Sequence, residues 1–393
     1  MAELLSVNEA LEAVLGRVEP LNAEPIGLAE APGRVLAEDA GALVDLPPFT
    51  SSAMDGFAVR AADTPGRLPV VERIAAGRPA PRALGAGEAM GIATGGVVPE
   101  GADAVVPIER VTTDGDQIEI AELAAAGANV RPRGGDVAAG AVVVSAGVRL
   151  GPQQIGALAA AGVGEVRCAR RPRVAVLTTG TELRRPGEAL APGEIYESNG
   201  PMLQVLLASA GAEVVPLASV ADDEDAHREA IEHGLAHDVL VTSGGVSVGP
   251  HDLVRRIEAE LGVEEVFWGV SVKPGKPLAF GVRGPTLVFG LPGNPVSSLV
   301  SSLLFVLPAL RALQGERDPE PRYLNGTLAA PAKADPRRDE LVRARLTSSG
   351  ELEPLTGQES HMIVRAAEAN ALVYVPAGDA ELPAGSTVRY LAL

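Results

Sequence analysis

The feature that most constrains the fold is an alternation of strand-like and helix-like segments between Arg173 and Arg317. Short apolar runs with the composition of buried strands are separated by segments whose apolar residues recur at helical spacing. This alternation is typical of a three-layer α/β domain with a mostly parallel sheet. The expected strands are Val174–Leu177, Val214–Leu217, Val239–Val241, Phe267–Val272, Leu278–Phe280 and Leu287–Phe289, and the expected helices are Met202–Ala210, Asp225–His237, Leu253–Leu261 and Ser297–Leu313.

Polar, glycine-rich segments follow three of these strands: Thr178–Glu182, Ser243–Asp252 and Leu291–Asn294. In sheets of this kind ligands bind outside the carboxyl ends of the strands. The bare backbone N–H groups of a Gly/Ser loop that enters a helix suit phosphate or another oxyanion. An ordinary strand-to-helix turn explains any one of these loops equally well. The coincidence of three such loops predicts a ligand site.

Two further short motifs support an anion site. Asn294 suits a helix N-cap and Pro295 the first helical position, so structure alone explains this pair, yet the helix that they begin presents a positive end to an anion. Lys273-Pro274-Gly275-Lys276 contains two of the chain's three lysines. A solvated loop is the simpler interpretation of the lysines, but their place beside glycine-rich strand ends favours phosphate binding.

The segments on either side of the α/β stretch are rich in short strands. Ser6 with Glu9 forms a capping box for an N-terminal helix. From Phe57 to Ile120, short apolar pairs alternate with Gly, Pro and Asp, which is a β-rich pattern. The tail Tyr323–Leu393 has the same character and predicts a small β-barrel. Breaks at Leu46–Phe49 and Arg131–Asp136 indicate crossings between domains.

Composition excludes several classes of protein. The net charge of −18 over 393 residues opposes binding to nucleic acid or to anionic membranes. Cys168 is the single cysteine, so one chain forms no internal disulfide and no thiolate metal cluster, which fits a reducing cytoplasm. The acidic N-terminus lacks the pattern of a signal peptide. The longest apolar run, Leu299–Leu310, is shorter than the roughly 20 residues that span a bilayer and indicates a buried helix.

Five acidic residues fall in loops: Asp55, Asp136, Glu182, Asp222 and Asp252. Each is explained singly as a cap, a turn former or a solvated charge. Together they are able to hold Mg²⁺, which prefers a few carboxylates with waters and ligand phosphate oxygens. The sequence contains no Walker loop, HExxH or G-x-S-x-G motif, and the histidines, His361 included, show no zinc-binding spacing with cysteine.

Eight motifs occur in order along nearly the whole chain. They are SSAMDGFAVR (51–60), IATGGVVPEGADAVVPIE (92–109), RPRGGD (131–136), TTGTEL (178–183), TSGGVSVGPHD (242–252), KPGKP (273–277), LPGNPVSS (291–298) and GQESHM (357–362). Each is weak alone, but the ordered set resembles the molybdopterin molybdenumtransferases of the MoeA type, which are related to the gephyrin E domain.

This resemblance implies an architecture and a reaction. The implied domains are an elongated one from 1–46 and 137–171, a β-rich insert from 47–136, an α/β molybdopterin-binding domain from 172–317 and a C-terminal β-barrel from 318–393. Members are homodimers in which the insert of one subunit faces the α/β domain of the other. They take adenylated molybdopterin and molybdate, cleave the phosphoanhydride with Mg²⁺ and yield molybdenum cofactor and AMP. The pterin dithiolene supplies the soft ligands of molybdenum.

The resemblance also assigns residues. It implies catalytic roles for Asp55, Asp252, Asp136, Glu182 and Asp222, with Glu182, Asp222 and Asp252 as ligands of Mg²⁺. It also implies a larger set of substrate-binding residues: Thr94, Ser243, Gly244, Gly245, Ser247, Lys273, Pro274, Gly275, Lys276, Pro292, Gly293, Asn294, Ser297 and Ser360. Molybdopterin adenylyltransferase and apo-molybdoenzymes are possible partners.

The chain departs from the family pattern at several positions: Ser51, Phe57, Gly96, Leu253, Gly269 and Glu359. Gly269 would remove a cation and Glu359 would add an anion near an anionic ligand. Two alternatives therefore stand beside the transferase. One is a molybdopterin adenylyltransferase, which shares the α/β domain alone. The other is a catalytically weakened paralogue that binds the pterin or acts as a scaffold.

Overall fold

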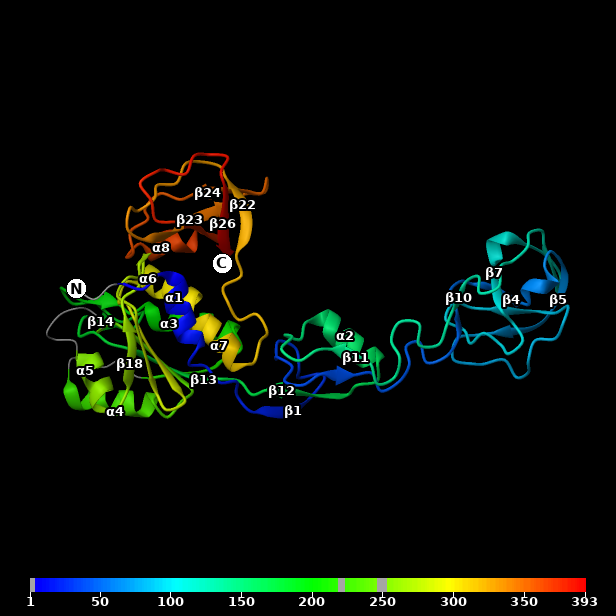
Figure 1. The fold of residues 1–393 in the computed structure, drawn as a ribbon, viewed down its shortest axis with the longest axis horizontal. Coiled ribbons are helices and arrows are strands. Elements are labelled where there is room, and N and C mark those ends of the chain that lie inside the picture. The colour runs from blue at the N-terminus through cyan, green and yellow to red at the C-terminus, as the bar shows by residue number, and fades with distance from the viewer. Residues whose placement is uncertain (1–3, 218–222, 246–252) are drawn as a thin grey trace.

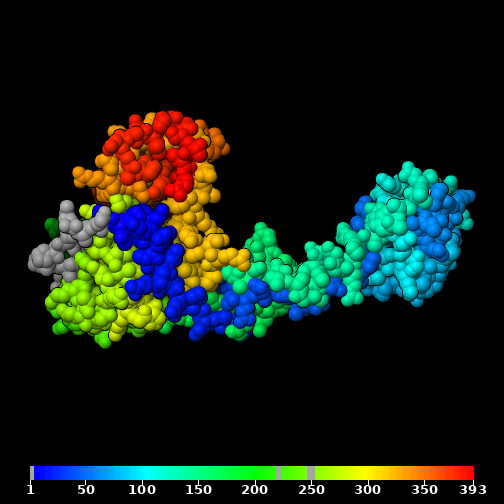
Figure 2. Space-filling view, viewed as in Figure 1, coloured from blue at the N-terminus to red at the C-terminus, as the bar shows by residue number. Residues whose placement is uncertain are grey.

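The computed structural model describes residues 4–217, 223–245 and 253–393, and the chain forms an elongated molecule (Figure 1). The α/β unit and the C-terminal barrel lie together at one end. The β-rich insert lies at the other end, beyond a slender connecting region (Figure 2). The insert is therefore remote from the α/β unit of its own chain.

The α/β unit contains a six-stranded sheet of order β16 (Glu213–Pro216), β13 (Arg173–Thr178), β17 (Val239–Ser243), β21 (Thr286–Leu291), β20 (Ala279–Arg283) and β18 (Glu264–Trp268). The first four strands are parallel, and β20 and β18 are antiparallel to their neighbours. Thr178 pairs with Ser243, and Ser243 with Leu291. The register thus brings three strand ends level with one another.

Both faces of this sheet are covered, as the alternation predicts. The helices are α3 (Asn199–Ser209), α4 (Glu224–Gly234), α5 (Leu253–Glu260), α6 (Pro295–Ser301) and α7 (Leu307–Leu313), with the π-helical turn Ser302–Val306 between the last two. Val174 and Val176 of β13 pack with α3, α6 and α7 in one buried cluster, while Ala175 and Leu177 pack with α4 and α5 in another. Successive residues of a strand point to opposite faces, so the three-layer α/β prediction is confirmed.

The N-terminal helix α1 (Val7–Leu15) also packs on the α/β unit. Ser6 and Glu9 form the predicted capping box, in which the Glu9 backbone N–H donates to Ser6 Oγ at 3.2 Å and Glu9 Oε2 accepts from the Ser6 backbone N–H at 2.8 Å. Val7 and Val14 are buried in the same cluster as β13. The helix therefore adds to the core of a unit that lies far from it in sequence.

The predicted helix Ser297–Leu313 is observed as one helical run from Pro295 to Leu313, because the π-helical turn joins α6 and α7. Its 19 residues are long and apolar enough to cross a membrane, yet 78% of an 18-residue stretch of it is buried inside the protein. The segment is accounted for as the central helix of the core.

The slender region pairs segments from the two ends of the insert. β1 (Ala23–Gly27) is antiparallel to β12 (Glu165–Ala169), and β2 (Ala40–Gly41) to β11 (Val142–Val144), with α2 (Pro152–Ala160) beside them. Cys168 lies in its core, and burial raises the pKa of the thiol. A thiol with a raised pKa is a poor nucleophile at neutral pH.

The insert is a curled six-stranded sheet of order β7 (Ala104–Pro107), β4 (Gly56–Val59), β6 (Ala89–Ile92), β5 (Gly66–Ile74), β9 (Gln117–Ile120) and β8 (Val111–Asp114). The chain enters at β3 (Ser51–Ser52) and leaves at β10 (Val130–Arg131), and these two strands pair antiparallel. The short 3₁₀ helices Ala61–Asp63 and Ile108–Arg110 complete it. The insert is thus a unit with its own core.

The tail forms the predicted barrel from five strands: β22 (Leu324–Leu328), β23 (Asp339–Leu346), β24 (Glu351–Pro354), β25 (Ala371–Val375) and β26 (Thr387–Ala392). The pairing of β23 with β25 closes it. The short helix α8 (Ile363–Ala367) follows the GQESHM loop, and β19 (Val272–Lys273) runs parallel to β23. The domain boundaries given above remain predictions.

Candidate functional site

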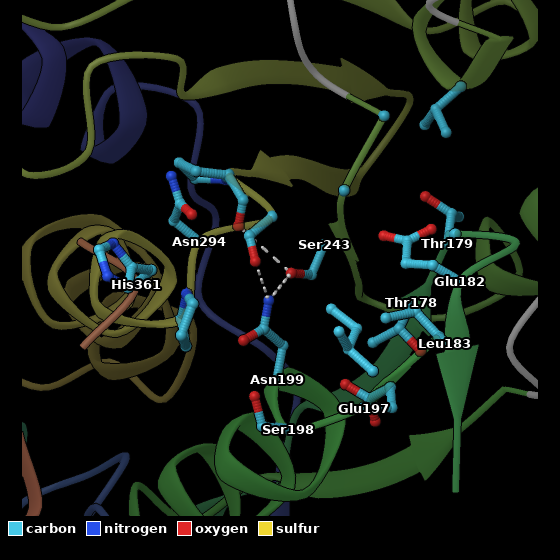
Figure 3. Close-up of a pocket in the computed structure, with 18 of the residues that line it drawn as sticks. Thr178, Thr179, Glu182, Leu183, Glu197, Ser198, Asn199, Ser243, Asn294 and His361 are labelled. Atoms are coloured by element: carbon cyan, nitrogen blue, oxygen red, sulfur yellow. Dashed lines mark hydrogen bonds between the residues drawn. The ribbon is translucent and has the colours of Figure 1, made fainter. Parts of the chain in front are cut away.

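A pocket of about 710 Å³ lies at the carboxyl ends of β13, β17 and β21 (Figure 3). Thr178–Gly180 and Glu182, Ser243–Gly245, and Pro292–Asn294 each contribute to its wall. These are the three loops that the sequence pattern places at one sheet edge, and the level register of the strands explains why they meet.

The loops approach one another closely because glycine occupies the points of contact. Gly244 has φ of 97°, and a Cβ there would lie 2.6 Å from the Thr179 carbonyl oxygen. A Cβ on Gly293 would lie 3.8 Å from Gly244 Cα. Positive φ and absence of a side chain are both needed at Gly244. The glycines thus make the narrow, backbone-lined floor of the pocket.

Asn199, which sequence reasoning did not single out, joins two of these loops. Its Nδ2 donates to Ser243 Oγ at 2.8 Å and to the Gly293 carbonyl oxygen at 2.8 Å (Figure 3). Ser243 Oγ in turn lies 3.4 Å from the Pro292 carbonyl oxygen. The first turn of α3 is thereby fixed against the ends of β17 and β21.

Two carboxylates line the pocket, one of them unexpected. Glu182 was predicted; Glu197, just before α3, was missed. Glu197 Oε1 accepts from the Gly200 backbone N–H at 2.7 Å, so it caps the helix. An acidic residue beside Ser198 and Asn199, ahead of an expected helix, is the signal that could have revealed it.

The barrel also contributes to the wall, through His361 and Ile363. Sequence reasoning noted only that His361 shows no zinc-binding spacing with cysteine. Arg343 of β23 is 1% exposed and donates to the carbonyl oxygens of Gly357, Glu359 and Met362 at 2.7, 3.1 and 2.8 Å. The GQESHM loop is therefore held in place by one buried cation.

The lysine loop lies beside the pocket and connects the α/β unit to the barrel. Pro277 lines the pocket, whereas Lys273 Nζ lies 3.2 Å from Glu340 Oε1 of β23. A Cβ on Gly275 would lie 2.9 Å from Ser301 Oγ, so the loop packs directly on α6. Lys276 is exposed. Pairing with Glu340 reduces the charge that Lys273 presents to a ligand.

Two predicted serines sit at the same junction. Ser297 is buried in α6. The Ser360 carbonyl oxygen accepts from the Val296 backbone N–H at 3.1 Å, which seats the GQESHM loop on the first turn of α6. Asn294 is the N-cap residue of α6 as predicted, but its side chain makes no capping hydrogen bond and lines the pocket.

Asp55 and Thr94 lie together in the insert, at the far end of the same chain (Figure 1). Asp55 Oδ1 accepts from the Thr94 backbone N–H at 2.7 Å, and both residues are exposed. Asp136, also exposed, lies where the chain leaves the insert. Within one chain these residues are not brought to the pocket. Asp222, Ser247 and Asp252 lie outside the described residues.

Gly269 and Glu359, two of the positions at which the chain departs from the family pattern, do not line the pocket within the described residues. Gly269 has φ of 90°, and a Cβ there would lie 2.6 Å from Leu4 Cδ2. Glu359 is exposed, and its carbonyl oxygen accepts from Arg343. Gly269 therefore has a structural explanation in this chain.

A second pocket of about 640 Å³ adjoins the first and shares Thr178, Leu183 and Glu197 with it. Its wall includes Arg184 of β14 (Leu183–Arg184), which pairs in parallel with β15 (Ile195–Tyr196). The two pockets therefore meet at these shared residues.

Three protein families match successive parts of the chain. Residues 5–162 match the family described as "MoeA N-terminal region (domain I and II)". Residues 175–312 match "Probable molybdopterin binding domain", and residues 325–393 match "MoeA C-terminal region (domain IV)".

Relatives resemble the chain over its whole length. Molybdopterin molybdenumtransferase 2 of Mycobacterium tuberculosis is 36% identical over 400 residues, which covers 98% of each chain. The molybdopterin molybdenumtransferase of Haemophilus influenzae is 34% identical over 395 residues, again covering 98% of each. The crystal structure of the molybdopterin biosynthesis moeA protein from Pyrococcus horikoshii OT3 superposes with a TM-score of 0.87 at 30% identity over 100% of both chains.

Proposed function

The chain belongs to the MoeA family, and from that premise we propose that it inserts molybdate into adenylated molybdopterin with Mg²⁺-dependent release of AMP. It is an enzyme of the transferase class, a molybdopterin molybdenumtransferase, in molybdenum cofactor biosynthesis. What we propose beyond this class is the identity of the substrates, the use of Mg²⁺, the homodimeric assembly and the cytoplasmic location.

The observation that carries the proposal is the convergence of three glycine-rich loops on one pocket. The backbone N–H of Gly245 and the beginning of α6 provide a polar floor that suits phosphate oxygens. The pocket and its neighbour, of about 710 and 640 Å³, adjoin one another and offer room for a ligand with two ring systems joined by phosphates. Molybdate, a dianion, would be attracted to Lys276 and to the Ser360 loop beside α6.

The residues present fit a magnesium ion. Across 4–217, 223–245 and 253–393, no group of three or more His, Cys, Asp or Glu side chains is arranged for a metal. Mg²⁺ requires only one or two carboxylates when waters and substrate phosphates complete its shell, and Glu182 and Glu197 both line the pocket. We propose Glu182 as a ligand, with Asp222 and Asp252 from outside the described residues. When bound, the ion would neutralise charge on the phosphoanhydride.

The chain's own groups would do the remaining work. Ser243 and the glycine backbone would hold the phosphate, and the helix beginning at Pro295 would favour negative charge there. His361 would close the pocket on the barrel side. These contacts orient the phosphoanhydride and limit the access of water to it.

We further propose a homodimer that shares each site between subunits. Asp55 and Thr94 lie at the far end of the chain from the pocket, so a second copy is the straightforward source of these groups. We propose a cytoplasmic location on the basis of the single buried cysteine. Molybdopterin adenylyltransferase and apo-molybdoenzymes are the proposed partners.

The two alternatives have less support. An adenylyltransferase would resemble the α/β domain alone, whereas relatives match 98% of this chain. A weakened paralogue was suggested by Gly269 and Glu359, and neither lines the pocket in the described part of the chain.

The decisive experiment supplies the purified protein with adenylated molybdopterin, Mg²⁺ and molybdate, and follows AMP by chromatography and cofactor by reconstitution of an apo-molybdoenzyme. We expect AMP release that depends on Mg²⁺ and cofactor formation that depends on molybdate. Absence of AMP at every metal concentration would reject the proposal. Adenylation of free molybdopterin by ATP would instead establish the adenylyltransferase.

A further inference from the structure

Asn199 occupies an unusual place in the pocket wall. It is the first residue of α3, is 8% exposed, and lines the pocket beside Ser243 and Gly293. Its Nδ2 donates to the Ser243 Oγ of one strand-end loop and to the Gly293 carbonyl oxygen of another, both at 2.8 Å. A single amide therefore links the ends of β17 and β21 to the start of a helix (Figure 3).

The orientation of this amide is fixed. A carbonyl oxygen accepts but does not donate, so the group that faces Gly293 has to be the NH₂. Oδ1 consequently points away from both loops, and among the described residues it has no donor although it is buried. A buried acceptor without a donor is unfavourable for stability. The Asn199 side chain thus keeps its two donated hydrogen bonds even though its own Oδ1 is left without a donor.

Besides the amide, a long contact of 3.4 Å between Ser243 Oγ and the Pro292 carbonyl oxygen joins the two loops. Gly244 and Gly293 face each other as bare backbone, with Gly244 Cα 3.8 Å from the position of a Cβ on Gly293. Backbone ladders hold each strand, and Gly244 N–H donates to the Leu291 carbonyl oxygen at 3.1 Å. Beyond these ladders, the turn Pro292–Gly293 is tied to α3 by the amide of Asn199.

We propose that Asn199 is a positioning residue that sets the distance between the Ser243–Gly245 loop and the Pro292–Asn294 loop, and so the fit of the pocket to the phosphate of its ligand. This inference rests on the proposed function. It assigns Asn199 no contact with reacting atoms, and its effect passes through Ser243 and Gly293.

The test compares Asn199→Asp, Asn199→Ala and Ser243→Ala with Leu203→Val as a control. Leu203 is fully buried one turn further along the same helix, where its side chain packs in the apolar core and takes no part in the hydrogen bonds of the amide. The first readout is hydrogen–deuterium exchange of peptides covering 240–245 and 289–294, without ligand. For Asn199→Ala we expect faster exchange in both peptides. For Asn199→Asp we expect faster exchange only in the peptide 289–294. For Leu203→Val we expect exchange in both peptides to stay unchanged.

The second readout is affinity for AMP with Mg²⁺, measured by calorimetry. Because two hydrogen bonds position the loops, Asn199→Ala should weaken AMP binding about tenfold, with a smaller effect for Ser243→Ala. In Asn199→Asp, a carboxylate oxygen would face the Gly293 carbonyl and repel it. Protonation restores a donor there, so the AMP affinity of this variant relative to that of the wild-type protein should recover as the pH falls from about 8 to about 5.

The outcomes separate the inference from the function on which it rests. Exchange unchanged in both loop peptides of Asn199→Ala would overturn the positioning role. Weakened AMP binding by Leu203→Val to the same degree would also overturn it, because the effect would then follow helix stability. Faster loop exchange in Asn199→Ala combined with no AMP binding by the wild-type protein would leave the positioning role intact and count against the proposed function.

Discussion

Arg343 of the barrel donates a hydrogen bond from Nη1 to the backbone carbonyl oxygen of Met362 at 2.8 Å. The same guanidinium reaches Gly357 and Glu359, so three carbonyl groups of one loop converge on one side chain. Burial lowers the pKa of Arg343, and Glu359 partly offsets this. An arginine remains charged under such a shift. A buried cation in one domain thus shapes the wall of a pocket in another.

Removal of this cation should loosen the barrel loop. Arg343→Ala leaves the carbonyl groups of Gly357 and Met362 without their donor, and we expect a loss of about 2–4 kcal/mol in the free energy of unfolding. Urea unfolding followed by circular dichroism measures it. Arg345→Ala, on the same strand but exposed, should change stability by less than about 0.5 kcal/mol. Equal losses in the two variants would contradict the anchoring role.

A side chain at Gly244 should distort the floor of the pocket. Gly244→Ala combines an unfavourable φ with overlap against Thr179, whereas Gly262→Ala has a φ of 85° but open space around its Cβ. Gly262→Ala should therefore cost about 1 kcal/mol, the conformational term alone. We expect Gly244→Ala to lose more stability than this and to lose AMP binding. Similar melting temperatures and normal binding in both variants would show that the overlap is relieved without consequence.

The stability of the junction between the slender region and the α/β unit should depend on pH. Burial tends to raise the pKa of Asp238, but the bidentate Arg170 and the Arg173 backbone N–H outweigh it, so the pKa is lowered from 3.8. The stabilisation is present above the unfolded value of 3.8 and is lost as the pH falls through the lower folded value. Asp238→Asn should cost about 1–3 kcal/mol at neutral pH and progressively less below about pH 4.

Urea titrations of the wild-type protein and of Asp238→Asn over this range measure that difference. Asp225→Asn, on the exposed face of α4, is the control and should show little change at any pH. A penalty for Asp238→Asn that stays constant into the acid range would mean that folding does not lower the pKa of Asp238, and would contradict the role assigned to its ion pair.

A shared site predicts complementation between inactive variants. Asp55→Asn alters the insert and Glu182→Gln alters the pocket, so each homodimer should be inactive. A mixed dimer has one site with both changes and one site with neither, and a statistical mixture should recover about a quarter of the wild-type activity. AMP release after co-refolding measures it. Activity no higher than that of the separate variants would indicate that both residues serve one chain's site or that no dimer forms.

Much of the fold can be predicted from local sequence patterns. The alternation from Arg173 to Arg317 predicts the layered domain, and the short strands after Tyr323 predict the barrel, because apolar periodicity reflects which faces are buried. The capping box at Ser6 and Glu9 is likewise local, since its atoms lie within one turn. The helix Ser297–Leu313 was also predicted as one run, although the π-helical turn within it leaves no sequence signal.

The residues that form the pocket can be predicted from the sequence only in part. The loops at Thr178, Ser243 and Leu291 were recognised because parallel strands place their carboxyl ends together. Asn199 and Arg343 were not, because they act on residues outside their own helix or strand: Asn199 on Gly293, and Arg343 on a loop of the barrel that reaches the α/β unit. Glu197 and His361 were also missed, although the capping of α3 by Glu197 is a local signal.

The sequence by itself determined the elements, the α/β and barrel classes and the loops that carry exposed backbone, because these depend on burial periodicity and on turn chemistry within a few residues. Tertiary structure alone decided which side chains complete the wall, and that Lys273 is paired with Glu340. It also separated Asp55 from the pocket by the length of the molecule. Hydrogen bonds and ion pairs form at distances near 3 Å, and only the folded chain brings groups that are remote in sequence so close together.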